Sequence, residues 1–277
     1  MTAYARPRDL DEALALRAAH PDWMVLAGGT DLMVNANHRP EPAGILDLWR
    51  LAGLGGIEVG ADAVVIGAGA TWSEVERHPV IQARLAPLAL AAREIGALQI
   101  QARATVGGNV GTSSPVGDSL PVLLALDAVL EVASVRGRRR VPYHAWCTGY
   151  RTTQLAPDEL IVSAALPLPG AATRTTWRKV GTRRAQSISK VMGAAAIELD
   201  GDTVTSARVA LGAVADRPIR IAAVEDAVRG QRLGAAAAEA ARAALRGAIR
   251  PIDDVRSTAA YRRDVAENLV ARFFSMS

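Results

Sequence analysis

At the start of the chain, a segment with apolar residues at helical spacing is followed by short apolar runs typical of strands. Asp9 stands in front of apolar positions 10, 13, 14 and 18, a pattern typical of a capped amphipathic helix that ends before Pro21. The segments that follow are predicted as a buried strand over 23–26, a glycine-rich turn over 27–31, a short helix over 32–36 and a strand over 44–48. The chain therefore opens with a strand, turn, helix and strand.

A second unit of similar pattern follows. Residues 64–71 are predicted to form a strand and turn, and apolar residues recur at helical spacing from Val80 to Ile95. A second glycine turn, Thr105-Val-Gly-Gly-Asn109, precedes the polar segment 111–118 and the apolar run 120–126. Long polar loops inside compact domains usually carry function, so this segment is a candidate site.

The pattern changes after Pro167-Leu-Pro-Gly170. Three strands are predicted over 174–180, 187–199 and 203–214, and Asp200-Gly201 is a strong hairpin signal between the last two. Helices are predicted over about 218–229, over 233–249 and from Ser257 onward. We therefore expect an α/β region before residue 171 and an α+β region after it.

Composition excludes several classes of protein. The chain has 277 residues, of which 50% are hydrophobic and 22% charged, so it can bury a sizeable core and is not disordered. No segment approaches the roughly 20 apolar residues of a membrane span, and the first nine residues lack a signal-like apolar run, so we expect a cytoplasmic protein. The single cysteine, Cys147, cannot hold an iron–sulfur cluster alone, so any redox role needs another carrier.

The net charge of +4 is carried almost entirely by arginine, because Lys179 and Lys190 are the only lysines among 32 basic residues. The one dense basic patch is Arg-Gly-Arg-Arg-Arg over 136–140. Nucleic-acid sites usually interleave such patches with aromatic residues, and no aromatic residue falls inside this run. A solvated hairpin turn is the favoured interpretation, and we expect no nucleic-acid partner.

The two glycine turns are the main candidates for chemistry. Consecutive small residues let backbone N–H groups converge on one point and form a nest for an anion such as phosphate. For either turn alone, an ordinary tight turn remains an equal alternative. Neither GxGxxG nor GxxxxGK[ST] occurs in the chain, which disfavours the nicotinamide-dinucleotide and P-loop folds.

Several motifs together resemble one family. They are Ala27-Gly-Gly-Thr-Asp-Leu32, Ile66-Gly-Ala-Gly-Ala-Thr71, Ile95-Gly-Ala-Leu-Gln-Ile100, Thr105-Val-Gly-Gly-Asn109, Ser114-Pro-Val-Gly-Asp118, Gly149-Tyr-Arg-Thr152, Lys179, Ile252-Asp-Asp-Val-Arg256 and Ala260-Tyr-Arg-Arg263. This set resembles the flavin subunit of molybdenum-containing hydroxylases, a group that includes the medium chain of aerobic carbon monoxide dehydrogenase and the flavin domain of xanthine dehydrogenase. The resemblance covers essentially the whole chain.

The resemblance implies an α+β fold in two domains. Residues 1–171 would form an FAD-binding domain of the p-cresol methylhydroxylase (PCMH) type, with α/β subdomains over about 1–55 and 56–171 that hold FAD between them. Residues 172–277 would form a C-terminal domain of the carbon monoxide dehydrogenase flavoprotein type, with a three-stranded antiparallel sheet and helices.

The resemblance also implies the residues that hold FAD. Both glycine turns would cradle the diphosphate through Val25, Leu26, Ala27, Gly28, Gly29, Thr30, Asp31, Leu32, Thr105, Val106, Gly107, Gly108 and Asn109. Asp118 would accept a hydrogen bond from a flavin N–H or a ribityl hydroxyl, or it caps a helix ahead of 120–126. Ile161 or Val162 would lie against the cofactor, although an ordinary strand core is the favoured interpretation for this pair.

Lys179 would stabilise negative charge on the N1–C2 edge of the reduced ring, and a plain surface lysine is the alternative. In a chain that uses arginine almost exclusively, a lysine suggests that a compact ammonium is needed. At Ile95 and Gly111 the sequence departs from relatives with an aromatic and a bulkier aliphatic residue, which leaves the flavin potential open. The four histidines lack metal-binding spacing, so we assign no metal ligand and no catalytic acid or base.

The function implied is that of an electron-transfer subunit. FAD on this chain would accept electrons from a small partner with 2Fe–2S clusters, while a large partner with the molybdenum cofactor oxidises the substrate, in a heterotrimer or a dimer of heterotrimers. Two alternatives stay open at this point: a free-standing FAD-dependent oxidase or dehydrogenase, and a non-catalytic nucleotide-binding assembly protein. Purines, carbon monoxide, nicotine-like heterocycles and aldehydes are all compatible as substrates of the complex, and NAD⁺, oxygen and quinone as acceptors.

Overall fold

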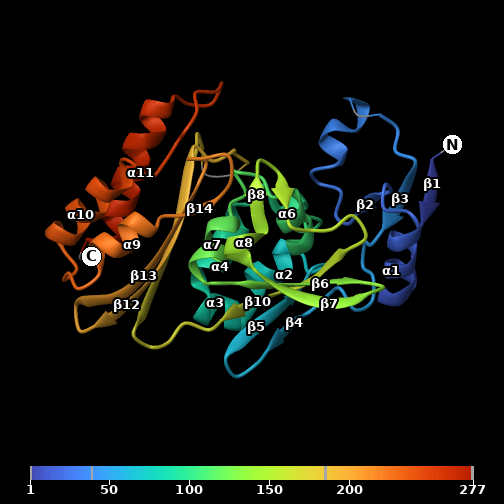
Figure 1. Ribbon diagram of the computed structural model, residues 1–277, viewed down its shortest axis with the longest axis horizontal. Coiled ribbons are helices and arrows are strands. Elements are labelled where there is room, and N and C mark those ends of the chain that lie inside the picture. The colour runs from blue at the N-terminus through green and yellow to red at the C-terminus, as the bar shows by residue number, and fades with distance from the viewer. Residues whose placement is uncertain (1, 39, 184–185, 276–277) are drawn as a thin grey trace.

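The computed structural model describes residues 2–38, 40–183 and 186–275. They form three parts in a row along the long axis of the molecule (Figure 1). We call residues 2–55 the first part, residues 56–171 the second part and residues 172–275 the third part. The described residues include no helix long and apolar enough to cross a membrane.

The first part is a small parallel sheet with two helices. Its elements are β1 (Ala3–Ala5), α1 (Leu10–Ala19), β2 (Met24–Leu26), the 3-10 helix η1 (Met33–His38) and β3 (Gly44–Asp47), and the strand order is β1-β3-β2. The Asp9 side chain accepts a hydrogen bond from the Glu12 N–H at 2.9 Å, so the predicted helix cap is confirmed. The short helix predicted after the first glycine turn is a 3-10 helix.

The second part is an antiparallel sheet covered by short helices. Its elements are β4 (Ile57–Val59), β5 (Ala63–Gly67), α2 (Trp72–Arg77), α3 (Pro79–Arg84), α4 (Ala86–Glu94), α5 (Leu98–Gln101), α6 (Val106–Thr112), α7 (Leu120–Ala125), β6 (Val129–Ser134), β7 (Gly137–Pro142), α8 (Tyr143–Trp146), β8 (Cys147–Gly149), β9 (Thr152–Thr153) and β10 (Leu160–Pro167). Five strands form the main sheet in the order β4-β5-β10-β6-β7, and β8 and β9 form a separate hairpin.

The stretch 80–95 is helical, as its apolar spacing predicts, but it is divided by a break. The chain forms two helices, α3 and α4, which meet at Leu85, where the backbone leaves the helical region. Pro87 follows two residues later, and a proline can neither donate to the carbonyl four residues back nor avoid its clash. Ile81, Leu85 and Leu88 are all buried on one side, which explains why the helical spacing continues across the break.

The third part is an antiparallel sheet with helices on its outer face. Its elements are β11 (Thr173–Val180), β12 (Val191–Asp200), β13 (Thr203–Gly212), β14 (Ile219–Arg220), α9 (Ala222–Val228), α10 (Ala235–Leu245) and α11 (Ala259–Phe274), and the strand order is β11-β12-β13-β14. The three long predicted strands are present, and the Asp200-Gly201 turn between β12 and β13 is confirmed. Some details differ from the prediction. Strand β12 begins at Val191 rather than at 187, and the short strand β14 lies where a helix was predicted from 218, so the sheet has four strands rather than the expected three.

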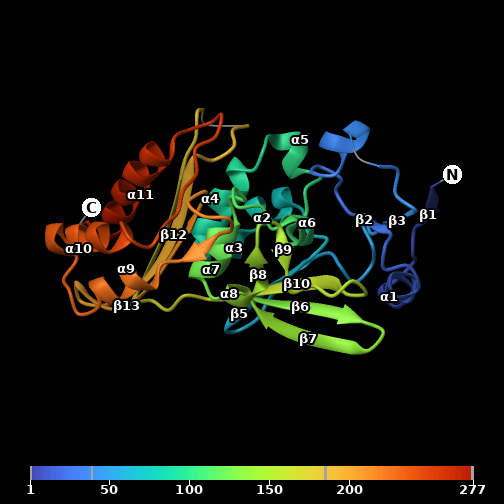
Figure 2. The same ribbon diagram turned by 45° about the horizontal axis from the view of Figure 1, so that its top comes forward.

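The sheet of the third part is packed between two layers of helices (Figures 1 and 2). Helices α4 and α7 of the second part cover one face, and α9 and α11 cover the other. The Trp177 indole N–H on β11 donates to the backbone oxygen of Asp118 at 3.1 Å, and Arg220 on β14 binds Asp127 at 2.8 Å. These contacts join both edge strands of this sheet, β11 and β14, to the second part.

Candidate functional site

A cleft of about 1050 Å³ lies where the three parts meet. The main groups that line it are residues 27–32 of the first part, residues 104, 105, 107–109 and 116–118 of the second part, Leu160 and Ile161 on β10, and residues 183 and 186–188 of the third part. Its volume is at the upper end of the range of about 300–1,000 Å³ typical of cofactor and small-molecule sites. The cleft is therefore the candidate functional site.

The two glycine turns lie side by side because glycine permits close backbone contacts. A Cβ atom on Gly28 would lie 1.8 Å from the backbone oxygen of Arg103, and one on Gly107 would lie 2.7 Å from the Cβ of Ala68. Neither contact is possible for a larger residue without moving backbone. Because Gly28 has no side chain, the first turn can pack directly against the backbone at Arg103, in the segment that leads into the second turn.

The first turn presents free backbone donors to the cleft. Gly29 has φ +78°, and the Met33 N–H donates to the Gly29 oxygen at 2.9 Å, which closes the turn. Within the described part of the chain, the N–H groups of residues 28–32 have no hydrogen-bond partner. Backbone N–H groups are nearly always paired with protein, water or ligand, so this row of donors is suited to an anion.

The second turn has a different structure from the one predicted. Residues 106–109 are the first turn of α6, and Thr105 is its N-cap, accepting from the Gly108 N–H at 3.0 Å. The N–H groups of Val106 and Gly107 donate to the backbone oxygens of Ala70 and Ala68 at 2.9 and 2.7 Å. An open nest here is therefore wrong, and this turn offers the cleft its surface and the Asn109 side chain.

Asn109 is held in place by Ser119. The Ser119 hydroxyl donates to the Asn109 Oδ1 at 2.6 Å, and Asn109 lines the cleft. This bond occupies the acceptor oxygen, so the amide NH₂ group remains as a donor for a ligand.

Asp118 and Lys179 form a buried ion pair at one side of the cleft. The Lys179 Nζ lies 2.6 Å from Asp118 Oδ2 and 3.2 Å from the Glu94 backbone oxygen, and the Ser189 hydroxyl donates to Asp118 Oδ1 at 2.5 Å. Burial raises the pKa of the Asp118 carboxyl above its ordinary value, and Lys179 and Ser189 oppose that rise. A carboxylate that lines the cleft is thus fixed by the third part.

The structure excludes two of the alternatives that the sequence left open for Asp118 and Lys179. The Lys179 side chain is 2% exposed, so a plain surface lysine is wrong. The N-cap position of α7 is Ser119 rather than Asp118, and no side chain makes a capping hydrogen bond there, so the helix-cap role of Asp118 is also wrong. Ser189 was missed as a site residue, because nothing in its local sequence indicates a partner 71 positions away.

Ile161 and Val162 point to different sides of β10. Ile161 lines the cleft together with Ile95, Ile100 and Leu155, whereas Val162 is 6% exposed and packs in the core between the first part and the main sheet. Successive side chains on a strand alternate between faces. Ile161 is therefore the member of the pair that can lie against a ligand. A Cβ atom built on Gly111 would lie 3.5 Å from the Cδ1 of Ile161, so the glycine leaves space beside this side chain.

Most of the predicted cofactor residues line the cleft. Those that do are Val25, Ala27, Gly28, Gly29, Thr30, Asp31, Leu32, Thr105, Gly107, Gly108, Asn109, Asp118 and Ile161, whereas Leu26, Val106, Val162 and Lys179 are not among its lining residues. Sequence reasoning missed Arg17, Trp23, Arg151, Arg183 and Ser187, which also line it. Of these, only Arg151 falls in a motif that the sequence analysis singled out.

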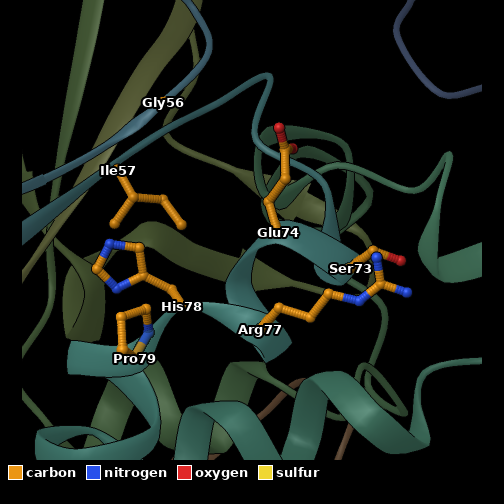
Figure 3. Close-up of a pocket in the computed structure, with 7 residues that line it drawn as sticks. All are labelled: Gly56, Ile57, Ser73, Glu74, Arg77, His78 and Pro79. Atoms are coloured by element: carbon orange, nitrogen blue, oxygen red, sulfur yellow. The ribbon is translucent and has the colours of Figure 1, made fainter.

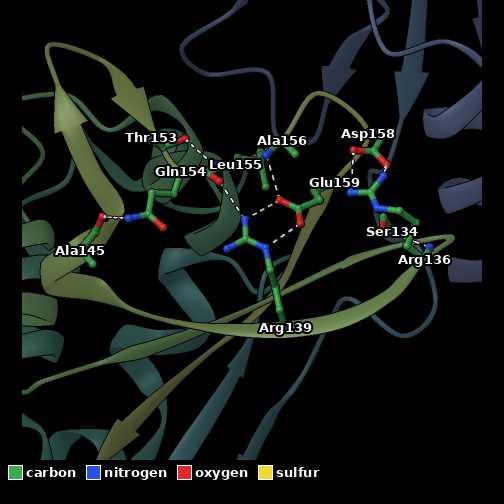
Figure 4. Close-up of polar contacts among 10 residues, drawn as sticks. All are labelled: Ser134, Arg136, Arg139, Ala145, Thr153, Gln154, Leu155, Ala156, Asp158 and Glu159. Atoms are coloured by element: carbon green, nitrogen blue, oxygen red, sulfur yellow. Dashed lines mark hydrogen bonds and ion pairs between the residues drawn. The ribbon is translucent and has the colours of Figure 1, made fainter.

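An arginine of the basic run binds Glu159, a residue that lines the cleft (Figure 4). Arg139 binds both carboxylate oxygens of the buried Glu159 at 2.7 Å and the Gln154 backbone oxygen at 2.8 Å. Arg136 pairs with Asp158. The hairpin prediction is confirmed, but most of the run lies on β7 rather than in the turn. Arg136, Arg138 and Arg139 each pair with a carboxylate of the same chain.

A second, smaller pocket of about 450 Å³ lies between the start of β4 and helix α2 (Figure 3). It is lined by Gly56, Ile57, Ser73, Glu74, Arg77, His78 and Pro79. Its carboxylate, Glu74, already accepts from the backbone N–H and hydroxyl of Thr71 at 2.6 and 2.7 Å. The larger cleft is the better candidate because the N–H groups of residues 28–32, which line it, have no hydrogen-bond partner among the described residues, and because residues of all three parts line it.

Comparison with known proteins agrees with this geometry along the whole chain. Residues 1–169 match the family described as FAD binding domain in molybdopterin dehydrogenase, and residues 177–277 match the carbon monoxide dehydrogenase flavoprotein C-terminal domain. The chain is 29% identical to the nicotinate dehydrogenase FAD-subunit of Eubacterium barkeri, over 97% of this chain and 93% of that protein. It is 30% identical to the carbon monoxide dehydrogenase medium chain of Hydrogenophaga pseudoflava, over 97% and 94%.

The fold is similar to a solved structure as well. A chain of the Hydrogenophaga pseudoflava carbon monoxide dehydrogenase that lacks the Mo-pyranopterin moiety superposes with a TM-score of 0.94 at 30% identity, over 98% of this chain and 95% of that one. The two-domain α+β architecture expected from the sequence is confirmed.

Proposed function

The chain belongs to the family of FAD-binding domains of molybdopterin dehydrogenases, and on that premise we propose that the cleft between its three parts holds one FAD. The chain is the FAD-carrying electron-transfer subunit of a molybdenum-containing hydroxylase, and its full-length relatives are the FAD subunit or medium chain of dehydrogenases. The finer assignments below rest on the cleft itself.

The donors and the apolar wall of the cleft match the chemistry of FAD. The free N–H groups of residues 28–32 would bind the diphosphate, and hydrogen bonds to charged groups contribute about 1.5–3 kcal/mol each. The apolar side chains of Ile95, Ile100 and Ile161 would pack on the flavin ring. Asn109 adds an amide donor to the diphosphate side, and the Gly28 backbone approaches its neighbour too closely to admit a side chain.

Asp118 would accept a hydrogen bond from a flavin N–H or a ribityl hydroxyl. Because Lys179 and Ser189 fix this carboxylate from behind, its free lone pairs have a defined direction. Lys179 would act on the flavin from this buried position, through its charge and through Asp118. The contact of its ammonium with the N1–C2 edge stays a prediction.

Bound FAD supplies the ability to take up and release electrons singly or in pairs. We infer that a small partner subunit with 2Fe–2S clusters delivers electrons to this chain and that a large partner carries the molybdenum cofactor, in a heterotrimer or a dimer of heterotrimers. Relatives described as subunits and medium chains support this assembly. The single cysteine supports it too, because a cluster needs thiolate ligands that this chain does not have.

The observation that carries the proposal is the row of N–H groups in the first turn that have no partner among the residues that the structure describes, in a cleft built by all three parts. The chain, stripped of ligand and mixed with FAD, is expected to retain flavin after desalting at about one FAD per chain. Its flavin should stay oxidised with organic substrates alone and become reduced when the reduced cluster-bearing subunit is added.

Each alternative makes a different prediction for the same experiment. A free-standing oxidase would be reduced by its organic substrate without any partner. A non-catalytic assembly protein would retain no flavin under any condition, and either result would contradict the proposed function.

Two further assignments stay proposals. We place the domain boundary at residue 171, with subdomains over about 1–55 and 56–171 and a C-terminal domain over 172–277, which the limits of the two family matches at 169 and 177 support. The cytoplasmic location stays a prediction from the sequence.

A further inference from the structure

The tip of the β8–β9 hairpin places a strained arginine at the cleft. The motif Gly149-Tyr-Arg-Thr152 forms this tip, with Gly149 paired to Thr152. Arg151 has φ +50°, a region that residues other than glycine rarely adopt, and such strain is often found at functional sites. Tyr150 is 65% exposed and is not among the lining residues, whereas Arg151 lines the cleft.

The guanidinium of Arg151 reaches across the cleft to the first turn. Its Nη2 lies 3.3 Å from Asp31 Oδ1, a contact between residues 120 positions apart. The hairpin belongs to the second part and Asp31 to the first, so the pair bridges the cleft beside the free N–H groups of residues 28–32.

Asp31 creates an electrostatic problem for the proposed ligand. A carboxylate next to an anion-binding turn repels a diphosphate, and the turn itself contains no basic residue. Two other arginines that line the cleft donate to carbonyl groups: Arg17 to the Trp23 oxygen at 2.8 Å and Arg183 to the Gln186 oxygen at 2.6 Å. Arg103, beside Gly28, has its guanidinium stacked 3.8 Å from the centre of the Trp49 ring.

We propose that Arg151 is a positioning residue for FAD: it neutralises Asp31 and thereby allows the diphosphate to occupy the first turn. This inference rests on the proposed function of the cleft. It gives the strained tip a role, because the left-handed backbone at Arg151 directs the side chain into the cleft while Tyr150 stays outside.

The test is Arg151→Gly, measured as the dissociation constant for FAD. Glycine adopts positive φ readily, so this change removes the charge without adding backbone strain. We expect FAD to bind about tenfold more weakly, the loss typical of one charge-assisted contact. The loss should shrink at high ionic strength, because the affected charges are partly exposed. Binding of riboflavin, which has no phosphate, should change less than twofold.

Arg50→Gly is a matched control. Arg50 is also an arginine at positive φ, +59°, but it does not line the cleft. Its removal changes the net charge by the same amount and should leave FAD affinity within twofold of the wild type. Thermal unfolding of both variants shows whether each is folded.

Asp31→Asn in the Arg151→Gly background tests the route of the effect. If Arg151 acts by neutralising Asp31, the double variant should recover to within about threefold of the wild-type affinity, since no repelling carboxylate remains. The inference is overturned if Arg151→Gly binds FAD as the Arg50→Gly control does, or if removing Asp31 restores nothing. If Arg151→Gly does not fold, Arg151→Gln must show the same loss and the same recovery. A wild-type chain that binds no FAD would instead contradict the proposed function.

Discussion

The Lys179 ammonium lies 2.6 Å from the Asp118 carboxylate across the boundary between the second and third parts. Asp118 belongs to the segment between α6 and α7, and Lys179 to strand β11. Both side chains are almost fully buried, at 2% exposed for Lys179 and 10% for Asp118. The pair thus connects the packing of the C-terminal domain directly to a carboxylate that lines the cofactor cleft.

Removing Lys179 should destabilise the chain strongly. Lys179→Met leaves Asp118 as an uncompensated buried carboxylate, and breaking a buried ion pair in this way typically costs about 3–5 kcal/mol. The free energy of unfolding from urea denaturation measures the effect. Lys190→Met is the matched control, because Lys190 lies 4.8 Å from the centre of the Tyr261 ring and should contribute about 0.5–1 kcal/mol. Equal losses in the two variants would refute the buried pair.

Gly28 should tolerate substitution less well than Gly108. An alanine at 28 meets the backbone oxygen of Arg103 at 1.8 Å, whereas an alanine at 108 meets only the Thr105 hydroxyl at 2.9 Å. Gly28→Ala is expected to lower stability by about 1–3 kcal/mol and to lose most retained FAD. Gly55→Ala, with no atom within 4 Å of its Cβ position, is the control. The measurements are the FAD content after desalting and the midpoint of urea denaturation. A Gly28→Ala chain that keeps its flavin would argue against FAD binding by the first turn.

Alanine substitutions on neighbouring positions of β10 should separate ligand contact from core packing. Val162→Ala removes buried apolar volume and is expected to cost about 1–3 kcal/mol of stability with FAD affinity unchanged. Ile161→Ala should have the smaller effect on stability and should weaken FAD binding by removing apolar contact from the cleft wall. Urea denaturation without ligand measures stability, and FAD titration measures affinity. If Val162→Ala weakened FAD binding without lowering stability, Val162 rather than Ile161 would be the residue that contacts the ligand.

Acid should destabilise the chain partly through Glu159. Hydrogen bonds from Arg139 hold the pKa of the Glu159 carboxyl below its ordinary value of 4.5. Because the unfolded chain takes up this proton at a higher pH than the folded chain does, the stabilisation is complete above pH 4.5 and is lost as pH falls toward the lower folded pKa.

Glu159→Gln should therefore lower stability at neutral pH and flatten its decline below pH 4.5. Glu131→Gln is the control: Glu131 pairs with Arg138 and is more exposed than Glu159. This change is expected to alter the loss of stability at acid pH less than Glu159→Gln does. Unfolding midpoints measured over a pH series for the three chains test this. If the unfolding midpoint fell equally below pH 4.5 in the wild type and in Glu159→Gln, the role assigned to the Arg139–Glu159 ion pair would be contradicted.

The parts of the fold that follow from local signals could be predicted. The Asp9 cap, the first glycine turn and the Asp200-Gly201 hairpin each depend on a few adjacent residues whose backbone preferences are strong. Prediction failed where the backbone conformation depends on residues outside the local pattern. Helical spacing concealed the break at Leu85, and the glycines of the second turn form the start of α6 because Ala68 and Ala70 accept the N–H groups of Gly107 and Val106.

The glycine turns and the polar segment 111–118 indicated the candidate site and the family resemblance added residues to it, but the site could not be completed from the sequence. The contacts that shape it join positions far apart, such as Ser189 with Asp118 and Arg151 with Asp31. Nothing in the local sequence of either partner indicates the other, since the contacts depend on how the three parts pack. For the same reason, only the structure could exclude a helix-cap role for Asp118 and a surface position for Lys179, and their contacts with FAD stay predictions.

The most direct test of the account follows the backbone N–H groups of the first turn during FAD binding. In amide NMR spectra of the ¹⁵N-labelled chain, saturating FAD should shift the resonances of residues 28–32 strongly and slow their exchange with solvent. The N–H groups of Val106 and Gly107 should change less, because they are already bonded within the protein. FAD that binds without moving the resonances of residues 28–32, or a chain that stays colourless in excess FAD, would contradict the account.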